Sequence, residues 1–284
     1  MVEKHSREYA LGPDLKEDRA WREFVRPLLG SLCKNVLGIC QYGLTAMLNN
    51  AIEHSEGTKV VVSVKRSVAD LEIEVVDDGI GIFRKIRDSL RLEDQQHAVL
   101  ELSKGRLTTD PEHHTGEGIY FTSRVFDRFG ILAGTLNLAT SSDQGWLLET
   151  GDSVKGTKVG MRISPSSRMT LKEVFDRHAS SDHHYRFSVT HVPVSLASIG
   201  DENLVSRSQA RRLVTRLDLF DVVVLDFRGV KSIGQAFADE VFRVFAREHP
   251  RTELRWSDAN EEVEQMISRA LAARAEEDTK RVDV

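Results

Sequence analysis

The sequence has few cysteines, whose disulfide bonds stabilise many small secreted proteins, and it has no long apolar run. Only two cysteines, Cys33 and Cys40, occur in 284 residues, which excludes a disulfide framework and a cysteine-rich zinc site. No apolar stretch approaches the length of a membrane span, and the N-terminus has no signal-peptide pattern. Positive charge is not in excess, since the net charge is -5. We therefore expect a cytoplasmic protein, and nothing indicates a membrane or nucleic-acid partner.

Apolar residues, by contrast, are plentiful enough for a substantial core. They make up 40% of the chain, and charged residues make up 29%, which is typical of globular proteins. The length suits one large domain or two ordinary ones. A Ser- and Pro-containing break at 164–167 favours two. We assign residues 1–165 to a first domain that begins with a loosely ordered leader, 166–184 to a linker and 185–284 to a second domain.

One stretch, residues 44–54, combines a regular apolar face with a polar side chain in the middle of a predicted helix. Ala46, Asn50 and His54 are spaced by fours, so they share a second side of this helix. An Asn adds little to helix propensity, and when buried it needs hydrogen-bond partners. Considered by itself, this helix indicates a structural Asn50 whose hydrogen bonds are made by neighbouring backbone groups. The apolar face is formed by Leu44, Met47, Leu48, Ala51 and Ile52.

A predicted strand at 71–76 runs directly into a glycine-containing turn. Asp77 stands where the strand ends, and Gly79 and Gly81 follow with a spacing of two. Glycines let the backbone turn tightly and approach a ligand closely. Asp-Gly turns are common, however, so this motif by itself indicates a plain turn.

A polar stretch at 84–114, which includes Lys104, follows and resembles a mobile cover over a site. Gly116 and Gly118 then open a predicted helix. The N-terminus of a helix offers unpaired N–H groups and positive potential, which suits phosphate. The alternative is a flexible loop before an ordinary helix. Thr157 follows a glycine at the start of a later strand.

These motifs, in this order, resemble the GHKL superfamily, which includes sensor histidine kinases, gyrase-type topoisomerases, heat-shock chaperones and anti-sigma-factor kinases. The resemblance covers about residues 15–165. It implies the Bergerat fold, an α/β sandwich, with ATP and Mg²⁺ as cofactors. A sensor histidine kinase is not expected, because the chain before Asn50 leaves little room for a phosphoacceptor hairpin.

The resemblance also implies roles for individual residues. Asn50 would hold the Mg²⁺ that bridges the phosphates, and Asp77 would accept a hydrogen bond from the adenine amine. The remaining implied ATP contacts are Gly79 and Gly81 at the adenine, Gly116 and Gly118 at the phosphates, Thr157 near the adenine, and Lys104 as a candidate phosphate contact.

Ala46 departs from the family pattern. Hydrolysing members carry a Glu at this position, which orients and deprotonates the attacking water, and Ala can do neither. The departure implies that ATP binds but turns over slowly. Two explanations fit: a member that only binds nucleotide, or a sequence in which a Glu has been lost or replaced. The second is favoured because the other motifs are intact.

The second domain is predicted to be a smaller α/β unit that resembles a STAS domain, the fold of anti-anti-sigma factors. Its apolar run at 222–227 is typical of a strand buried on both faces. Gly234 and Gln235 stand where those factors carry an Asp-Ser phosphoacceptor pair, and Ser232 is the nearest hydroxyl. Loop and helix capping is the favoured role of Ser232.

Three functions remain open from the sequence. The favoured one is a bacterial-type regulator, in which ATP binding controls the cover and the docking of the STAS-like domain on a partner or a second copy. The alternatives are a serine protein kinase of the anti-sigma type and a non-enzymatic scaffold with a vestigial pocket. Enzyme activity is expected only if a Glu is restored at Ala46.

Overall fold

The computed structural model describes residues 3–107, 116–141, 145–179, 186–198 and 203–282, and its contacts divide the chain into two compact units. Unit 1 is Met1–Asp176 and unit 2 is Arg177–Val284. In the described ranges, no helix is both long enough and apolar enough to cross a bilayer.

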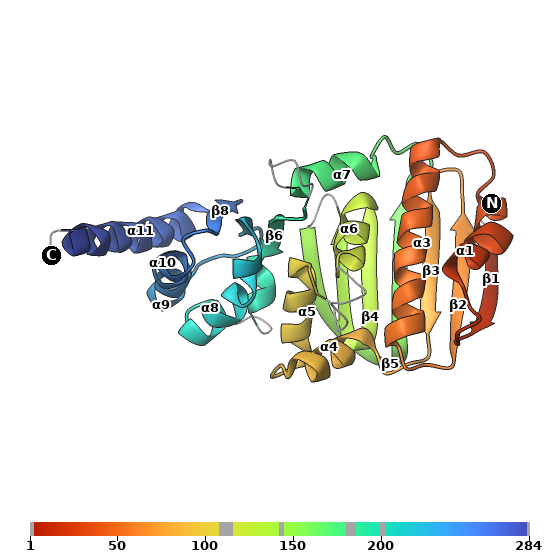
Figure 1. The fold of residues 1–284 in the computed structure, drawn as a ribbon, viewed down its shortest axis with the longest axis horizontal. Coiled ribbons are helices and arrows are strands. Elements are labelled where there is room, and N and C mark those ends of the chain that lie inside the picture. The colour runs from red at the N-terminus through yellow and green to blue at the C-terminus, as the bar shows by residue number, and fades with distance from the viewer. Residues whose placement is uncertain (1–2, 108–115, 142–144, 180–185, 199–202, 283–284) are drawn as a thin grey trace. The chain divides into compact units, whose positions relative to one another are not determined.

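Unit 1 is built on an antiparallel sheet with the strand order β1-β2-β3-β5-β4 (Figure 1). Alternating apolar residues on β2 and β3 bury one face: Val60, Val62, Ile73 and Val75 are almost completely inaccessible to solvent. β3 lies in the middle of the sheet, so the Asp77 at its end is placed by strands on both sides. The strands are β1 (Glu3–Ala10), β2 (Lys59–Arg66), β3 (Leu71–Asp77), β4 (Arg128–Ser141) and β5 (Gly145–Ile163).

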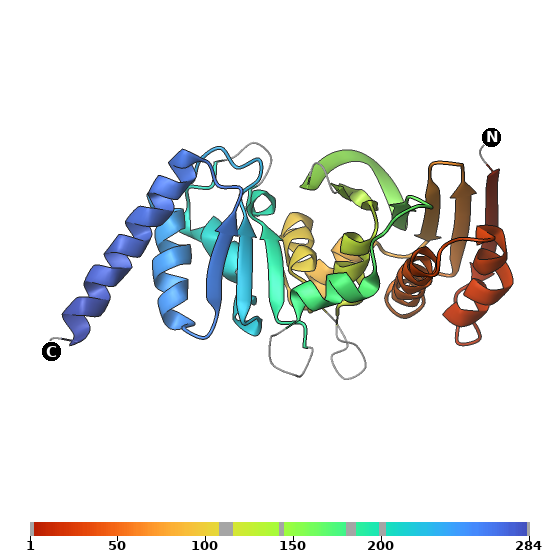
Figure 2. The same ribbon diagram turned by 90° about the horizontal axis from the view of Figure 1, so that it is seen from above.

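Helices cover one face of this sheet, as the view from above shows (Figure 2). The long α3 (Lys34–His54) carries the stretch singled out in the sequence and buries Leu44, Met47 and Leu48. Phe175 of α7 stacks edge-on against Phe121, with ring centroids 4.6 Å apart, so α7 belongs largely to this unit. The other helices are α1 (Glu17–Ala20), a π-helix (Trp21–Val25), α2 (Arg26–Leu29), α4 (Ile82–Leu90), α5 (Gln95–Lys104), α6 (Gly118–Val125) and α7 (Leu171–His178).

One local prediction for unit 1 was wrong, and another was incomplete. The expected leader contains β1, which pairs with β2 along its whole length. β1 lies at the sheet edge with exposed side chains, so it has no apolar alternation to reveal it. The expected mobile cover contains α4 and α5, and Phe83, Val99 and Leu100 in these helices are buried. Residues 108–115 of that stretch lie outside the described residues.

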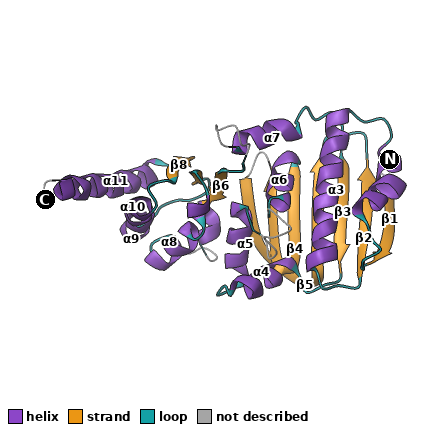
Figure 3. Cartoon of the chain, viewed as in Figure 1, coloured by secondary structure: helices purple, strands orange, loops and turns teal. Residues whose placement is uncertain are grey.

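Unit 2 is a parallel sheet with the order β6-β7-β8, packed against helices (Figure 3). On β7, Val223 and Leu225 are fully buried, whereas Val222 and Val224 are partly exposed. The strand is therefore buried on one face and not on both. Its elements are β6 (Val189–Pro193), a 3-10 helix (Val194–Ala197), α8 (Arg207–Val214), a second 3-10 helix (Leu217–Leu219), β7 (Val222–Asp226), α9 (Gln235–Ala238), a π-helix (Asp239–Phe245), α10 (Ala246–Glu248), β8 (Glu253–Ser257) and α11 (Glu261–Val282).

Candidate functional site

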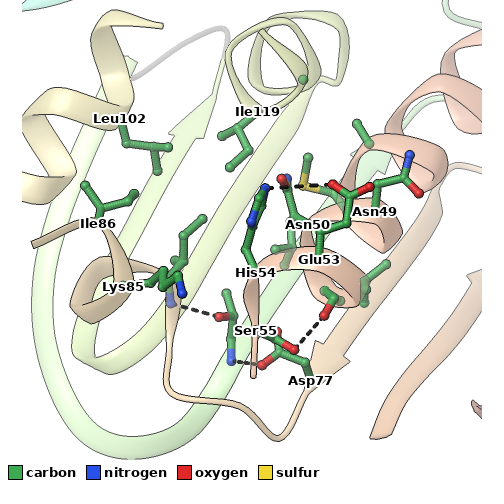
Figure 4. A pocket seen from close by; sticks show the side chains of 18 of the residues that line it. Asn49, Asn50, Glu53, His54, Ser55, Asp77, Lys85, Ile86, Leu102 and Ile119 are labelled. Carbon is green, nitrogen blue, oxygen red and sulfur yellow. Dashed lines mark hydrogen bonds and ion pairs between the residues drawn. The ribbon is translucent and has the colours of Figure 1, made fainter. Parts of the chain in front are cut away.

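A cavity in unit 1 lies among α3, α4, α5, the start of α6 and the adjoining ends of β3 and β5 (Figure 4). Its lining brings together residues from distant parts of the sequence, which meet because the helices share one face of the sheet. The predicted site residues in this lining are Ala46, Asn50, Asp77, Gly116, Gly118 and Thr157.

Asp77 lines this cavity and is only 6% exposed. Its Oδ1 accepts hydrogen bonds from the backbone N–H of Gly79 (2.9 Å) and of Thr157 (3.2 Å). Burial raises the pKa of this carboxyl above its usual value, although the two N–H donors oppose the shift. The backbone thus holds one carboxylate oxygen, so Oδ2 is the atom suited to accept a hydrogen bond from a ligand amine.

The turn after Asp77 depends on close backbone approaches that only glycine allows. A Cβ at Gly79 would overlap the carbonyl of Ser55. Gly81 has a φ of +87° and directly precedes α4, whose first N–H, at Ile82, donates to the Thr157 hydroxyl (3.0 Å). The two glycines therefore allow the backbone conformation that positions Asp77 and Thr157, and they do not line the cavity themselves.

Ala46 and Asn50 lie one turn apart on the cavity side of α3. The start of α6 approaches this side so closely that a Cβ at Gly118 would lie 3.2 Å from the Cβ of Ala46. Gly116 has a φ of +68° and its added Cβ would overlap the backbone of Leu107. The N-terminal N–H groups of α6 and the Asn50 carboxamide thus share one end of the cavity, where an anionic group can be held.

Comparison with family models assigns both units. Residues 40–166 match the model of the histidine kinase-, DNA gyrase B- and HSP90-like ATPases. Residues 209–264 match the model of a STAS-like domain of unknown function. The chain carries a GHKL-type ATPase domain followed by a STAS-like domain. A comparison with curated proteins gave no match. The ATPase family binds ATP, usually with Mg²⁺, and the combination supports a regulatory ATP-binding protein.

Lys104, the candidate phosphate contact, does not line the cavity of the ATPase domain. It lies at the end of α5 with no exposed surface, and its Nζ is 2.6 Å from Oε1 of the equally buried Glu101. A buried ammonium needs such a carboxylate partner. The sequence could not reveal this burial, because a lysine in a polar stretch has the same local pattern whether it is exposed or packed.

Several cavity residues of the ATPase domain were not identified from the sequence as site residues. Lys85 of α4 lines the cavity and pairs with Glu56 at its edge. Glu53 also lines it, and its Oε2 lies 3.8 Å from Nε2 of His54, as Figure 4 shows. His54 and Asn50 are four residues apart and therefore share one side of α3. This spacing was the signal that could have identified this end of the helix as part of the site. Apolar walls are added by Met47, Ile82, Ile86, Leu102 and Ile119.

The glycine at position 156 gives a direct test of the backbone geometry around Asp77. Gly156 has a φ of +73°, and an added Cβ would overlap the carbonyl oxygen of Asp77. We expect Gly156→Ala to lower the free energy of unfolding by about 2 kcal/mol or more, measured by urea titration. Gly151→Ala, on the same strand with no atom within 4 Å of its Cβ, is the matched control and should change it little. Equal effects would contradict the assigned strain.

In the STAS-like domain, the loop that carries a phosphoacceptor pair in anti-anti-sigma factors is closed by a tight contact. The N–H of Gly234 donates to the carbonyl of Leu204 (2.8 Å), and a Cβ at Gly234 would lie 2.8 Å from Cα of Val205. Gln235 follows as the exposed first residue of α9. The close approach explains a glycine here and leaves no room for an Asp side chain at this position.

Proposed function

We propose that the chain is a nucleotide-gated regulator: Mg-ATP binds in the cavity of the ATPase domain, is hydrolysed slowly, and controls how α4 and α5 cover the site. The position of α4 and α5 over the site in turn controls how the STAS-like domain docks on a partner or a second copy. The single observation that carries this proposal is the convergence of Asn50, Asp77, Gly118 and Thr157 on one cavity in which position 46 is an alanine.

The proposed orientation of ATP follows from the chemistry at the two ends of the cavity. Asp77 and Thr157 form a buried polar corner beside apolar side chains, which suits a flat base with an exocyclic amine. Gly116, Gly118 and Asn50 form the other end, where backbone N–H groups favour phosphate. The adenine is therefore assigned to the β3 end and the triphosphate to the start of α6.

The lining fits a magnesium ion shared with the nucleotide. Within the described ranges, no group of three His, Cys, Asp or Glu side chains could hold a metal by itself. Magnesium usually takes only one or two protein oxygens and completes its shell with waters and phosphate. The Asn50 carboxamide oxygen would be such a ligand, and the ion would neutralise phosphate charge.

Slow hydrolysis is proposed because position 46 has no proton acceptor. Ala46 faces the start of α6, where the phosphates are assigned, and its methyl group cannot orient or deprotonate water. The bound nucleotide would then persist and act as a signal.

Amide hydrogen exchange on the full chain tests whether nucleotide controls the cover. α5 contributes Leu102 to the cavity wall, and α4 contributes Lys85 and Ile86. We expect Mg-ATP to slow exchange in α4 and α5 by about tenfold or more, because a nucleotide bound beneath these helices opposes their local opening. Mg-AMP, which lacks the β- and γ-phosphates, is the control. Equal protection by ATP and AMP, with both bound, would contradict phosphate control of the cover.

A further inference from the structure

β8 forms one edge of the STAS-like sheet, and among the described residues no strand pairs with its outer side. Glu253 donates its N–H to the Asp221 carbonyl (2.8 Å), and Ser257 accepts from the N–H of Phe227 (3.0 Å). These bonds face β7. Because the backbone groups of successive residues in a strand point to opposite sides, the N–H and C=O groups of Leu254 and Trp256 point to the open edge. The edge thus presents a row of backbone groups ready to pair with another strand.

A groove with both apolar and polar lining runs beside this edge, and its polar lining residues are Thr252, Glu253 and Arg274. Leu254 and Trp256 line it from β8, Phe242 and Ala246 line it from the helical layer, and Leu271 lines it from α11. The Trp256 ring lies edge-on to Phe242, with centroids 5.7 Å apart, yet the residue remains 39% exposed. A half-covered Trp beside unpaired backbone is typical of a binding surface.

The other face of β8 carries one charge of each sign. Glu253 and Arg255 are both more than half exposed, and they pair within the strand through a 2.8 Å contact between Oε1 and Nε. Natural proteins often protect a sheet edge with charges, because like charges on two copies repel each other. Opposite charges two residues apart do not give that protection. When two copies of the strand are related by a two-fold axis, the acid of each copy can lie opposite the arginine of the other.

We propose that β8 is the interface of a homodimer, in which two copies of the edge pair antiparallel about a two-fold axis at Leu254. The proposal names the partner for the docking role proposed above for the STAS-like domain. In this register Glu253 of each copy lies opposite Arg255 of the other, and the two Leu254 residues exchange both backbone hydrogen bonds. The two sheets then form one continuous sheet across the axis.

The neighbouring registers are less favourable. An axis at Arg255 would place the two Arg255 side chains directly opposite each other, which is destabilising. A shift by one residue would place Leu254 opposite Arg255 and mix the apolar and charged faces. The outward backbone groups and the charges therefore select the same register.

Charge reversal with mixing tests this interface in the full chain. Sedimentation analysis should show a concentration-dependent dimer. Arg255→Glu and Glu253→Arg should each weaken dimerisation by about tenfold or more, because each places like charges opposite one another. An equimolar mixture of the two variants should restore the dimer, since one copy then carries two acids and the other two arginines.

Arg186→Glu is the matched control, because it reverses an exposed charge of the same domain that pairs with Asp221 and with no side chain of β8. It should leave the dimer unchanged, and circular dichroism checks that every variant is folded. A monomeric wild-type chain, or a mixture no more dimeric than its components, would overturn the proposal. A monomer that still pairs β8 with an extended peptide would assign the edge to another partner and also overturn it. Nucleotide titration of the same samples tests the ATP-dependent function separately.

Discussion

Replacing Ala46 with glutamate is expected to raise the rate of ATP hydrolysis by about a hundredfold to ten-thousandfold, the usual contribution of a general base. Ala46 lines the cavity, so a longer side chain at this position extends toward the assigned phosphates. The carboxylate would orient the attacking water and accept its proton. Phosphate release under single-turnover conditions measures the rate, and radiolabelled ATP shows whether phosphate is transferred to protein instead.

Ala46→Gln is the matched control for this variant. Glutamine has nearly the same shape as glutamate but cannot accept the proton at neutral pH, so its turnover should stay close to that of the wild-type chain. Calorimetry must show that all three proteins bind Mg-ATP. Equal hydrolysis by the Glu and Gln variants would show that the missing base does not limit turnover.

Asp77→Asn is expected to weaken ATP binding by about tenfold to a hundredfold, the usual effect of losing a hydrogen bond to a charged, buried acceptor. The amide can keep its oxygen toward the N–H groups of Gly79 and Thr157, so the turn is preserved. The NH₂ group then replaces Oδ2, and it repels the adenine amine. Calorimetric titration with Mg-ATP measures the change.

The neighbouring Asp78→Asn variant separates recognition from stability. The Asp78 carboxylate accepts hydrogen bonds from the Thr58 N–H (2.7 Å) and hydroxyl (2.8 Å) and does not line the cavity. The Lys59 N–H (3.0 Å), together with these two Thr58 donors, holds the pKa of Asp78 well below its usual range. Its replacement should reduce stability and leave ATP affinity unchanged. Equal losses of affinity in both variants would place the nucleotide elsewhere.

The sequence predicted the ATPase domain because several short motifs occur in a fixed order. Asn50, Asp77, Gly118 and Thr157 were each ambiguous alone, and their order led to a resemblance that the family comparison bears out. The order succeeds because the fold places those four positions around one cavity. Their individual contacts with nucleotide remain predictions.

The features that the sequence did not predict depend on contacts between distant residues. β1 has exposed side chains and is recognised only by its pairing with β2. Lys104 pairs with Glu101 only three residues before it, but the burial of both side chains depends on how α4 and α6 pack against α5. The open edge of β8 depends on the strand order of the STAS-like sheet, which no local pattern encodes. In each case, packing between distant parts of the chain decides the environment of a residue, and the neighbouring residues in the sequence do not reveal it.

Calorimetric titration of the full wild-type chain with Mg-ATP and, separately, Mg-GTP tests the central claim most directly. The account predicts one ATP bound per chain and at least about tenfold weaker binding of GTP, because Asp77 accepts from the amine of adenine and meets a carbonyl in guanine. No binding of ATP at millimolar concentration, or equal binding of the two nucleotides, would contradict it.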